Sequence, residues 1–74
     1  MKAIIWSKDI CPYCIQAKKL LEFKGIEYEE RKIGAGFTKE ELLEEIPMAR
    51  SAPQIIIDDE YVGGYTELKK HLGA

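Results

Sequence analysis

Apolar and polar positions follow one another along this chain in two rhythms, one typical of strands and one typical of helices. Residues 3–6 and 55–57 are short apolar runs without alternation, which is typical of strands covered on both faces. Residues 26–29 alternate between apolar and acidic side chains, which predicts a half-buried strand near a sheet edge. A further strand is predicted over 61–64, because an acidic turn at 58–60 can join it to the preceding run as a hairpin.

Three other segments have the spacing of amphipathic helices, and local signals mark their ends. Pro12 suits the first turn of a helix, where its missing N–H is no loss, and Gly25 is a stop signal. Thr38 and Glu41 have the spacing of a capping box, which opens the second helix. The predicted helices cover residues 12–24, 39–46 and 65–72.

These elements follow the order β-α-β-α-β-β-α, which predicts an α/β fold. A helical crossover between the first two strands requires them to be parallel, whereas the hairpin is antiparallel. We therefore expect one mixed four-stranded sheet with three helices on its faces, in a single domain spanning residues 1–74. The predicted strands cover residues 2–7, 26–33, 54–58 and 61–64.

Composition restricts the class of function. The 74 residues include 11 basic and 13 acidic side chains, and a net charge of -2 is too balanced for non-specific nucleic-acid binding. The apolar runs are far shorter than the ~20 residues that span a bilayer. The N-terminus also lacks the apolar region of a signal peptide. We therefore expect a cytoplasmic protein that binds neither nucleic acid nor membrane.

Cys11 and Cys14 are the only cysteines, and they could be a structural clip, half of a metal site or a reactive pair. A disulfide between them would close a very short loop and would remove little entropy from the unfolded chain. A structural zinc site needs about four ligands. The one histidine, His71, lies near the far end of the chain, so we expect no metal site. In a reducing compartment, a close cysteine pair is typical of redox chemistry or metal binding.

The position of Cys11 at the start of the first predicted helix favours its thiolate. Unpaired N–H groups and the helix dipole stabilise negative charge there, and cysteines in such motifs have pKa values of roughly 3.5–7.5. Lys8 adds positive potential. We expect a solvent-facing Cys11 to be the nucleophile and a less exposed Cys14 to close the disulfide. Trp6 closes the strand leading to Cys11, so we expect its fluorescence to report the redox state.

Three motifs together resemble the glutaredoxin family, which has a thioredoxin-like fold. The sequence "CPYC" at 11–14, with Lys8 before it, is similar to the family's active site. The segment "RSAPQ" at 50–54 resembles its Thr-Val-Pro loop, and "GGYTE" at 63–67 resembles the segment that opens its last helix. The resemblance covers nearly the whole chain and includes the order of its elements. Ser51 and Ala52 depart from the family pattern by replacing Thr and Val.

The resemblance implies a set of residues that bind glutathione beside the cysteine pair. Pro53 would be a cis-proline that turns the backbone of Ala52 toward the substrate, so that the two pair like added strands. Gly64, with Gly63 before it, would let the backbone approach the ligand closely. Tyr13 would flank the sulfur and pack beside the tripeptide.

Charged groups would hold the two ends of glutathione. The resemblance places Thr66 and Glu67 at its γ-glutamyl end, where a helix N-terminus suits the carboxylate and Glu67 can take the ammonium group. Lys8 and Arg50 would meet the glycyl carboxylate at the other end.

The resemblance implies a disulfide oxidoreductase that uses glutathione as reductant and holds no tightly bound cofactor. Its partners would be glutathione and glutathionylated or disulfide-containing proteins, and we expect a monomer. Three alternatives stay open at this point. These are a carrier of a glutathione-ligated [2Fe–2S] cluster, a redoxin of the same fold reduced by thioredoxin reductase, and a module that only binds proteins.

Overall fold

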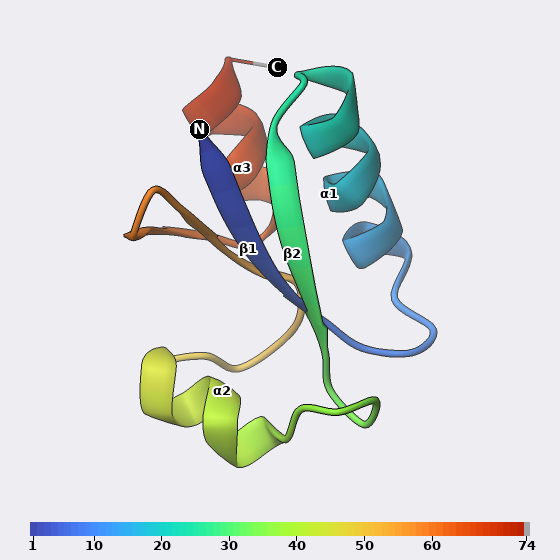
Figure 1. Cartoon of the computed structure of the whole chain (residues 1–74), viewed down its shortest axis with the longest axis vertical. Helices are drawn as coiled ribbons and strands as arrows, with labels where there is room; N and C mark the ends of the chain where they lie inside the picture. The colour runs from blue at the N-terminus through green and yellow to red at the C-terminus, as the bar shows by residue number, and fades with distance from the viewer. Residues whose placement is uncertain (74) are drawn as a thin grey trace.

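The computed structural model describes residues 1–73 and contains one sheet of four strands with three helices (Figure 1). Its strands lie in the order β2-β1-β3-β4. The β1–β2 pair is parallel, whereas β1–β3 and β3–β4 are antiparallel. The predicted fold class and element order are therefore confirmed. The elements are β1 (Lys2–Ser7), α1 (Pro12–Phe23), β2 (Glu27–Lys32), α2 (Lys39–Glu45), β3 (Gln54–Ile57), β4 (Glu60–Gly63) and α3 (Tyr65–Leu72).

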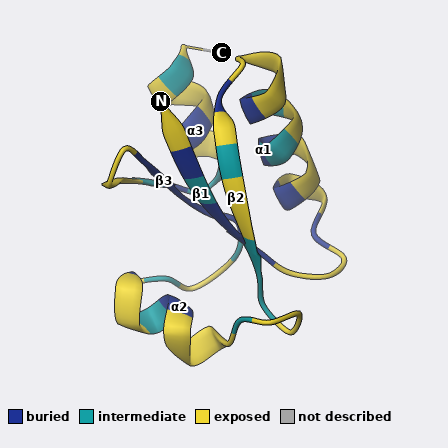
Figure 2. Cartoon of the chain, in the orientation of Figure 1, coloured by how far each residue is buried: buried dark blue, intermediate teal, exposed yellow. Residues whose placement is uncertain are grey.

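The interior strand β1 contributes to two core clusters, one on each face of the sheet, because successive side chains on a strand point to opposite faces. Ala3 and Ile5 are fully buried in the cluster covered by α1 and α3. Trp6 belongs to the cluster under α2, with Ile4 packed against it. Buried positions lie mainly on the two interior strands, β1 and β3, and on the sides of α1 and α3 that face the sheet (Figure 2). The apolar run of β1 is thus explained by burial on both faces.

The residues predicted to start and stop the helices do so, and the observed helix ends lie within one residue of the predicted ones. Cys11 is the N-cap of α1, and Pro12 occupies its first turn. Gly25 has a positive φ of 70° just after the helix, which suits a residue without a Cβ. In α2 both bonds of the capping box between Thr38 and Glu41 are present. The first two helices end one residue earlier than predicted. No helix within residues 1–73 is long and apolar enough to cross a membrane.

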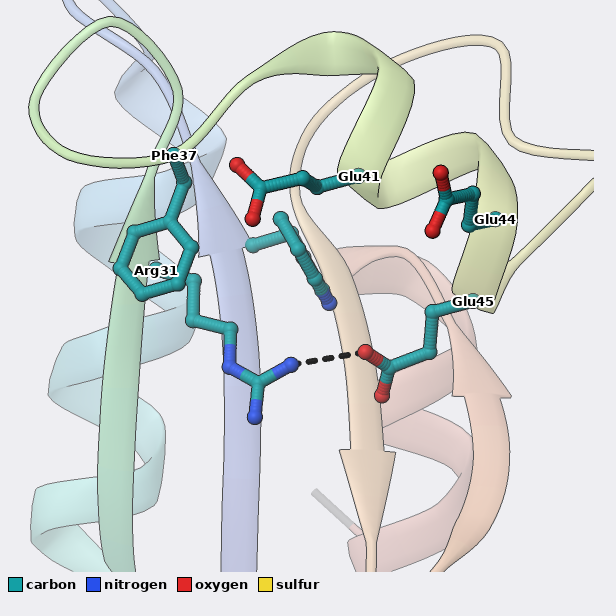
Figure 3. A pocket seen from close by; sticks show the side chains of 6 residues that line it. Arg31, Phe37, Glu41, Glu44 and Glu45 are labelled. Carbon is teal, nitrogen blue, oxygen red and sulfur yellow. Dashed lines mark hydrogen bonds and ion pairs between the residues drawn. The ribbon is translucent and has the colours of Figure 1, made fainter.

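The cluster under α2 borders an acidic hollow of about 340 Å³ (Figure 3). Trp6 lines it, is only 1% exposed and packs edge-on against Phe37, with ring centroids 5.7 Å apart. Arg31 lies over the indole at 5.2 Å and donates to Glu45 at 2.7 Å. Strand alternation turns the Trp6 side chain to the sheet face opposite α1, so the structure does not support the expectation that its fluorescence reports the redox state.

We expect oxidised and reduced protein to show the same Trp6 emission maximum. The indole is buried beneath α2, with the sheet between it and the cysteine pair, so closing the disulfide should not change its surroundings. The measurement is tryptophan emission at matched concentration in both redox states. Phe37→Leu is the control, since removing the ring packed against Trp6 should change the emission and prove the probe sensitive. A redox-dependent shift would mean that chemistry on one face is transmitted through the sheet.

Candidate active site

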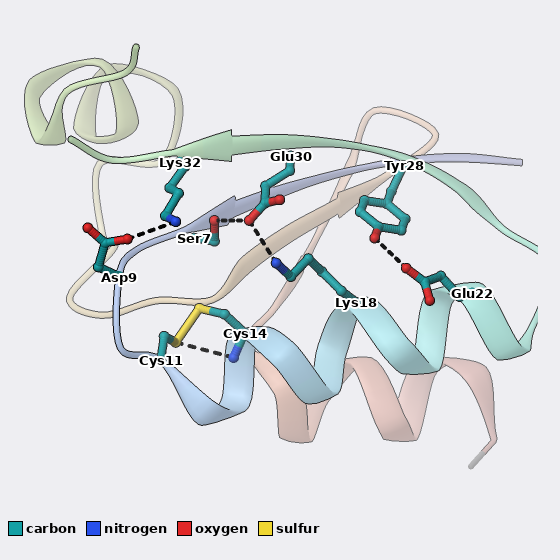
Figure 4. Close-up of polar contacts among 9 residues, drawn as sticks. All are labelled: Ser7, Asp9, Cys11, Cys14, Lys18, Glu22, Tyr28, Glu30 and Lys32. Atoms are coloured by element: carbon teal, nitrogen blue, oxygen red, sulfur yellow. Dashed lines mark hydrogen bonds and ion pairs between the residues drawn. A yellow bond between two sulfur atoms is a disulfide. The ribbon is translucent and has the colours of Figure 1, made fainter. Parts of the chain in front are cut away.

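The cysteine pair lies at the carboxyl end of β1, where the chain turns into α1 (Figure 4). Cys11 has extended backbone angles, with φ −134° and ψ 92°, as an N-cap residue requires. Its Sγ accepts a hydrogen bond of 3.2 Å from the backbone N–H of Cys14. A disulfide joins the two cysteines, whose Cα atoms are 5.2 Å apart. The same N–H group can stabilise negative charge on Cys11 Sγ after reduction.

Both cysteines are buried, which corrects one expectation and agrees with another. Cys14 is 2% exposed and Cys11 is 6% exposed, so Cys14 is the less exposed of the two, as predicted. The expectation that Cys11 faces solvent is wrong. Its Sγ lies 3.7 Å from the carbonyl oxygen of Ala52, so the loop before β3 covers the sulfur.

A groove of about 150 Å³ is lined by segments from three parts of the chain. The Ala52–Pro53 peptide bond in its wall is cis, as the resemblance implies. Ser51 and Tyr65 also line the groove, although the sequence did not predict them as site residues. The groove gathers six of the predicted binding residues, which are Tyr13, Ala52, Pro53, Gly64, Thr66 and Glu67.

Tyr65 forms part of an aromatic stack that the sequence analysis did not predict. Its ring is stacked on that of Tyr13, with centroids 5.9 Å apart and an interplanar angle of 30°. The ammonium group of Lys69 lies 5.5 Å from the centre of the Tyr65 ring on the same helix. The signal that could have found Tyr65 is its place directly after the Gly-Gly pair, at the start of α3.

The start of α3 supplies hydrogen-bond donors to the groove. Gly64 is the N-cap, and its N–H donates to Oε1 of Glu67 at 2.8 Å. A Cβ on Gly63 would lie 2.9 Å from the side-chain carbons of Glu67, and its φ of 124° also disfavours other residues. Because the first N–H groups of a helix have no partner within it, this end of the groove is suited to an anion.

Lys8 and Arg50 lie together in a neighbouring hollow of about 230 Å³, which Lys39 also lines. Ser51 lines both this hollow and the groove, so the two adjoin at that residue. Within residues 1–73, none of the three cations forms an ion pair. The predicted binding residues are thus split between a groove with a helix N-terminus and an adjoining basic hollow.

A polar cluster ties α1 to the sheet beside the cysteine pair (Figure 4). The buried hydroxyl of Ser7 donates to Oε2 of Glu30 at 2.7 Å, and Lys18 of α1 donates to the same oxygen at 3.0 Å. The Ser7 bond, followed by Lys18, lowers the pKa of Glu30 below its ordinary value, although partial burial opposes this. Asp9 pairs with Lys32 at 2.7 Å, and this bond raises the pKa of Lys32.

Comparison with known proteins agrees with the motifs and the geometry. The sequence model of the glutaredoxin family matches residues 3–62. Glutaredoxin 3 of Escherichia coli K12 is 38% identical over 64 residues, which cover 86% of this chain and 77% of that protein.

Solved structures show the same similarity. The crystal structure of glutaredoxin 1 from Francisella tularensis complexed with cacodylate has a TM-score of 0.83 and 33% identity, covering 97% of this chain and 92% of that one. A buckwheat glutaredoxin–glutathione complex has a TM-score of 0.79 and 25% identity, covering 96% and 68%. The thioredoxin-like fold expected from the resemblance is therefore confirmed.

We expect Ser7→Ala to lower the free energy of unfolding by about 1 kcal/mol at pH 7, because Glu30 loses a buried hydrogen-bond donor. The folded-state pKa of Glu30 is depressed, so the stabilisation is present above its ordinary pKa of 4.5. It is lost as the pH falls through the folded value.

Urea unfolding of wild type and Ser7→Ala at pH 7 and at pH 3 measures this difference. Ser51→Ala is the control, since that exposed hydroxyl binds no carboxylate within residues 1–73. A stability difference that is the same at both pH values would show that the Ser7–Glu30 bond is not its source.

Proposed function

This chain belongs to the glutaredoxin family and is a disulfide oxidoreductase, and we propose that glutathione is its reductant. Its substrates would be glutathionylated molecules and protein disulfides, reduced through Cys11 and Cys14. The observation that carries the proposal is the groove beside the disulfide. It combines a backbone edge at Ala52, the aromatic ring of Tyr13 and the N-terminus of α3.

Each part of the groove suits one part of a γ-glutamyl tripeptide. The free N–H groups at the start of α3 can bind the γ-glutamyl carboxylate, and the Glu67 carboxylate can bind its ammonium group. The backbone of Ala52 can pair with the cysteinyl residue, whose sulfur then lies beside Cys11. The buckwheat glutaredoxin of similar fold was solved as a glutathione complex, which supports this assignment.

The other end of the tripeptide would lie toward the basic hollow. Glutathione ends in a glycyl carboxylate, and Lys8, Arg50 and Lys39 line the hollow that adjoins the groove at Ser51. Exposed ion pairs of this kind are each worth only about 0–1 kcal/mol. The basic hollow would therefore orient the ligand, with each cation adding a little to affinity.

In the proposed reaction the Cys11 thiolate attacks the glutathione sulfur of a mixed disulfide. A bond forms between Cys11 Sγ and that sulfur, while the substrate sulfur leaves as a thiolate and takes a proton from solvent. A second glutathione thiolate then attacks the glutathione sulfur bound to Cys11. The products are oxidised glutathione and the Cys11 thiolate, which the Cys14 N–H stabilises.

Protein disulfides would follow a route that uses both cysteines. Cys11 forms a mixed disulfide with one substrate sulfur and releases the other as a thiol. Cys14 then attacks Cys11, which frees the substrate and closes the Cys11–Cys14 bond seen in the structure. Two glutathione molecules would reopen this bond and leave as oxidised glutathione.

We expect turnover with NADPH, glutathione and glutathione reductase, but little turnover with NADPH and thioredoxin reductase. The physical reason is that the groove and the basic hollow offer partners for both ends of a small zwitterionic tripeptide. The measurement is NADPH consumption with the mixed disulfide of glutathione and 2-mercaptoethanol as substrate. Turnover by thioredoxin reductase alone would instead support a redoxin of the same fold.

We expect Cys11→Ser to abolish the reduction of both glutathione mixed disulfides and protein disulfides, whereas Cys14→Ser should affect only the second reaction strongly. Reduction of a glutathione mixed disulfide needs one protein thiol, so Cys14→Ser should retain it. Reduction of a protein disulfide should slow at least about tenfold, because the adjacent Cys14 acts at a high effective concentration. Paired turnover assays on the two substrates test this. Loss of the first activity in Cys14→Ser and its retention in Cys11→Ser would reverse the two roles.

A further inference from the structure

Ile10, the residue directly before Cys11, is placed where neither the core nor the backbone favours it. Its side chain is 96% exposed, more than any other large hydrophobic side chain found exposed within residues 1–73. Its φ is 51°, in the left-handed region. A β-branched residue with positive φ is a conformational outlier, whereas glycine or asparagine adopts that conformation easily.

The other positive-φ residues show how unusual this choice is. Within residues 1–73, the only other non-glycine residues with positive φ are Asp58 and Asp59, which form the turn of the β3–β4 hairpin. Short polar side chains tolerate this conformation, and a hairpin turn requires it. Isoleucine at position 10 therefore has an unfavourable backbone conformation, and burial of its side chain does not offset this cost. Residues in such conformations cluster at functional sites.

The surroundings of Ile10 anchor the turn beside it and leave its side chain exposed. Asp9 is tied to Lys32 at 2.7 Å, so the turn before Cys11 is anchored to the end of β2. Ile10 does not line the groove that holds Tyr13 and Ala52. Its side chain therefore stays available when glutathione fills the groove, next in sequence to the sulfur that exchanges.

We propose that Ile10 contacts the polypeptide that carries the substrate sulfur, and that this enzyme favours cysteines flanked by apolar residues. The inference rests on the proposed role of Cys11 as nucleophile. When Cys11 Sγ bonds to a substrate sulfur, the residues next to that sulfur come close to position 10. An apolar neighbour then removes the exposed Ile10 side chain from water, and this contact lowers the free energy of the transition state.

The test follows one step that needs no glutathione. Two peptides each carry a single cysteine in a mixed disulfide with 2-nitro-5-thiobenzoate, with leucine on both sides in one and serine in the other. The Cys11 thiolate bonds to the peptide sulfur, and thionitrobenzoate leaves as a coloured thiolate with the bonding electrons. Each rate constant is divided by that of glutathione thiolate with the same peptide, which removes differences in intrinsic reactivity.

The variants separate contact from backbone effects. Ile10→Asn keeps a residue that tolerates positive φ but removes the apolar side chain, and Ile10→Gly removes the conformational cost as well. Phe23→Asn is the matched control, because Phe23 is also highly exposed, at 84%, but lies at the opposite end of α1. The mixed disulfide of thionitrobenzoate with 2-mercaptoethanol is the small substrate that has no flanking residues.

We expect reduced wild type and Phe23→Asn to prefer the leucine peptide by about tenfold, as burial of part of an aliphatic side chain allows. Both Ile10 variants should lose most of this preference. Their rate constants with the small disulfide should equal that of wild type, and their urea midpoints of unfolding should be no lower than that of wild type. The proposal would be overturned if wild type reacted with both peptides at the same rate, or if the preference for the leucine peptide survived Ile10→Asn. It would also be overturned if the Ile10 variants slowed as much with the small disulfide as with the peptides, because Ile10 would then be a positioning residue for Cys11.

The result is independent of the proposed reductant. A wild type that shows the peptide preference but no turnover with glutathione would contradict the proposed function and leave the role of Ile10 supported.

Discussion

The hydrogen bond from the backbone N–H of Cys14 to Cys11 Sγ connects the fold to its chemistry. The N–H groups of a helix's first turn have no partner within the helix, and in α1 a sulfur accepts from one of them, a role that a side-chain oxygen often takes. The group that caps α1 is therefore also one of the two sulfurs of the disulfide. Because β1 is an interior strand of the sheet and α1 packs against its buried residues, the sulfur is held beside the core.

The two faces of the sheet differ in what they position. The face under α1 and α3 positions the cysteine pair and includes the Ser7–Glu30–Lys18 cluster, which fixes α1 beside the end of β1. The face under α2 contains Trp6, Phe37 and Arg31, which are packed against one another away from the disulfide. A small domain buries a limited amount of surface, so both faces of one sheet are needed to stabilise a single site.

The groove is built from segments that only the complete fold brings together. Tyr13 comes from α1, Ala52 and Pro53 come from the loop before β3, and Glu67 comes from α3. Pairing of β3 with β1 places the loop over Cys11, and the β3–β4 hairpin leads α3 back to Tyr13. Loss of any of these pairings would leave the cysteine motif intact in sequence but without a groove beside it.

The sequence by itself determined the features that depend on spacing. Apolar runs and helical periodicity placed the seven elements, the capping box of Thr38 and Glu41 marked the start of α2, and Pro12 put Cys11 at a helix start. Tertiary structure decided the features that depend on contact between distant residues. Cys11 Sγ lies against the carbonyl oxygen of Ala52, 41 positions away, and the stack of Tyr13 on Tyr65 joins two helices. Local patterns specify which residues share an element or a face, whereas packing of whole elements decides which distant side chains meet, and no spacing along the chain encodes that distance.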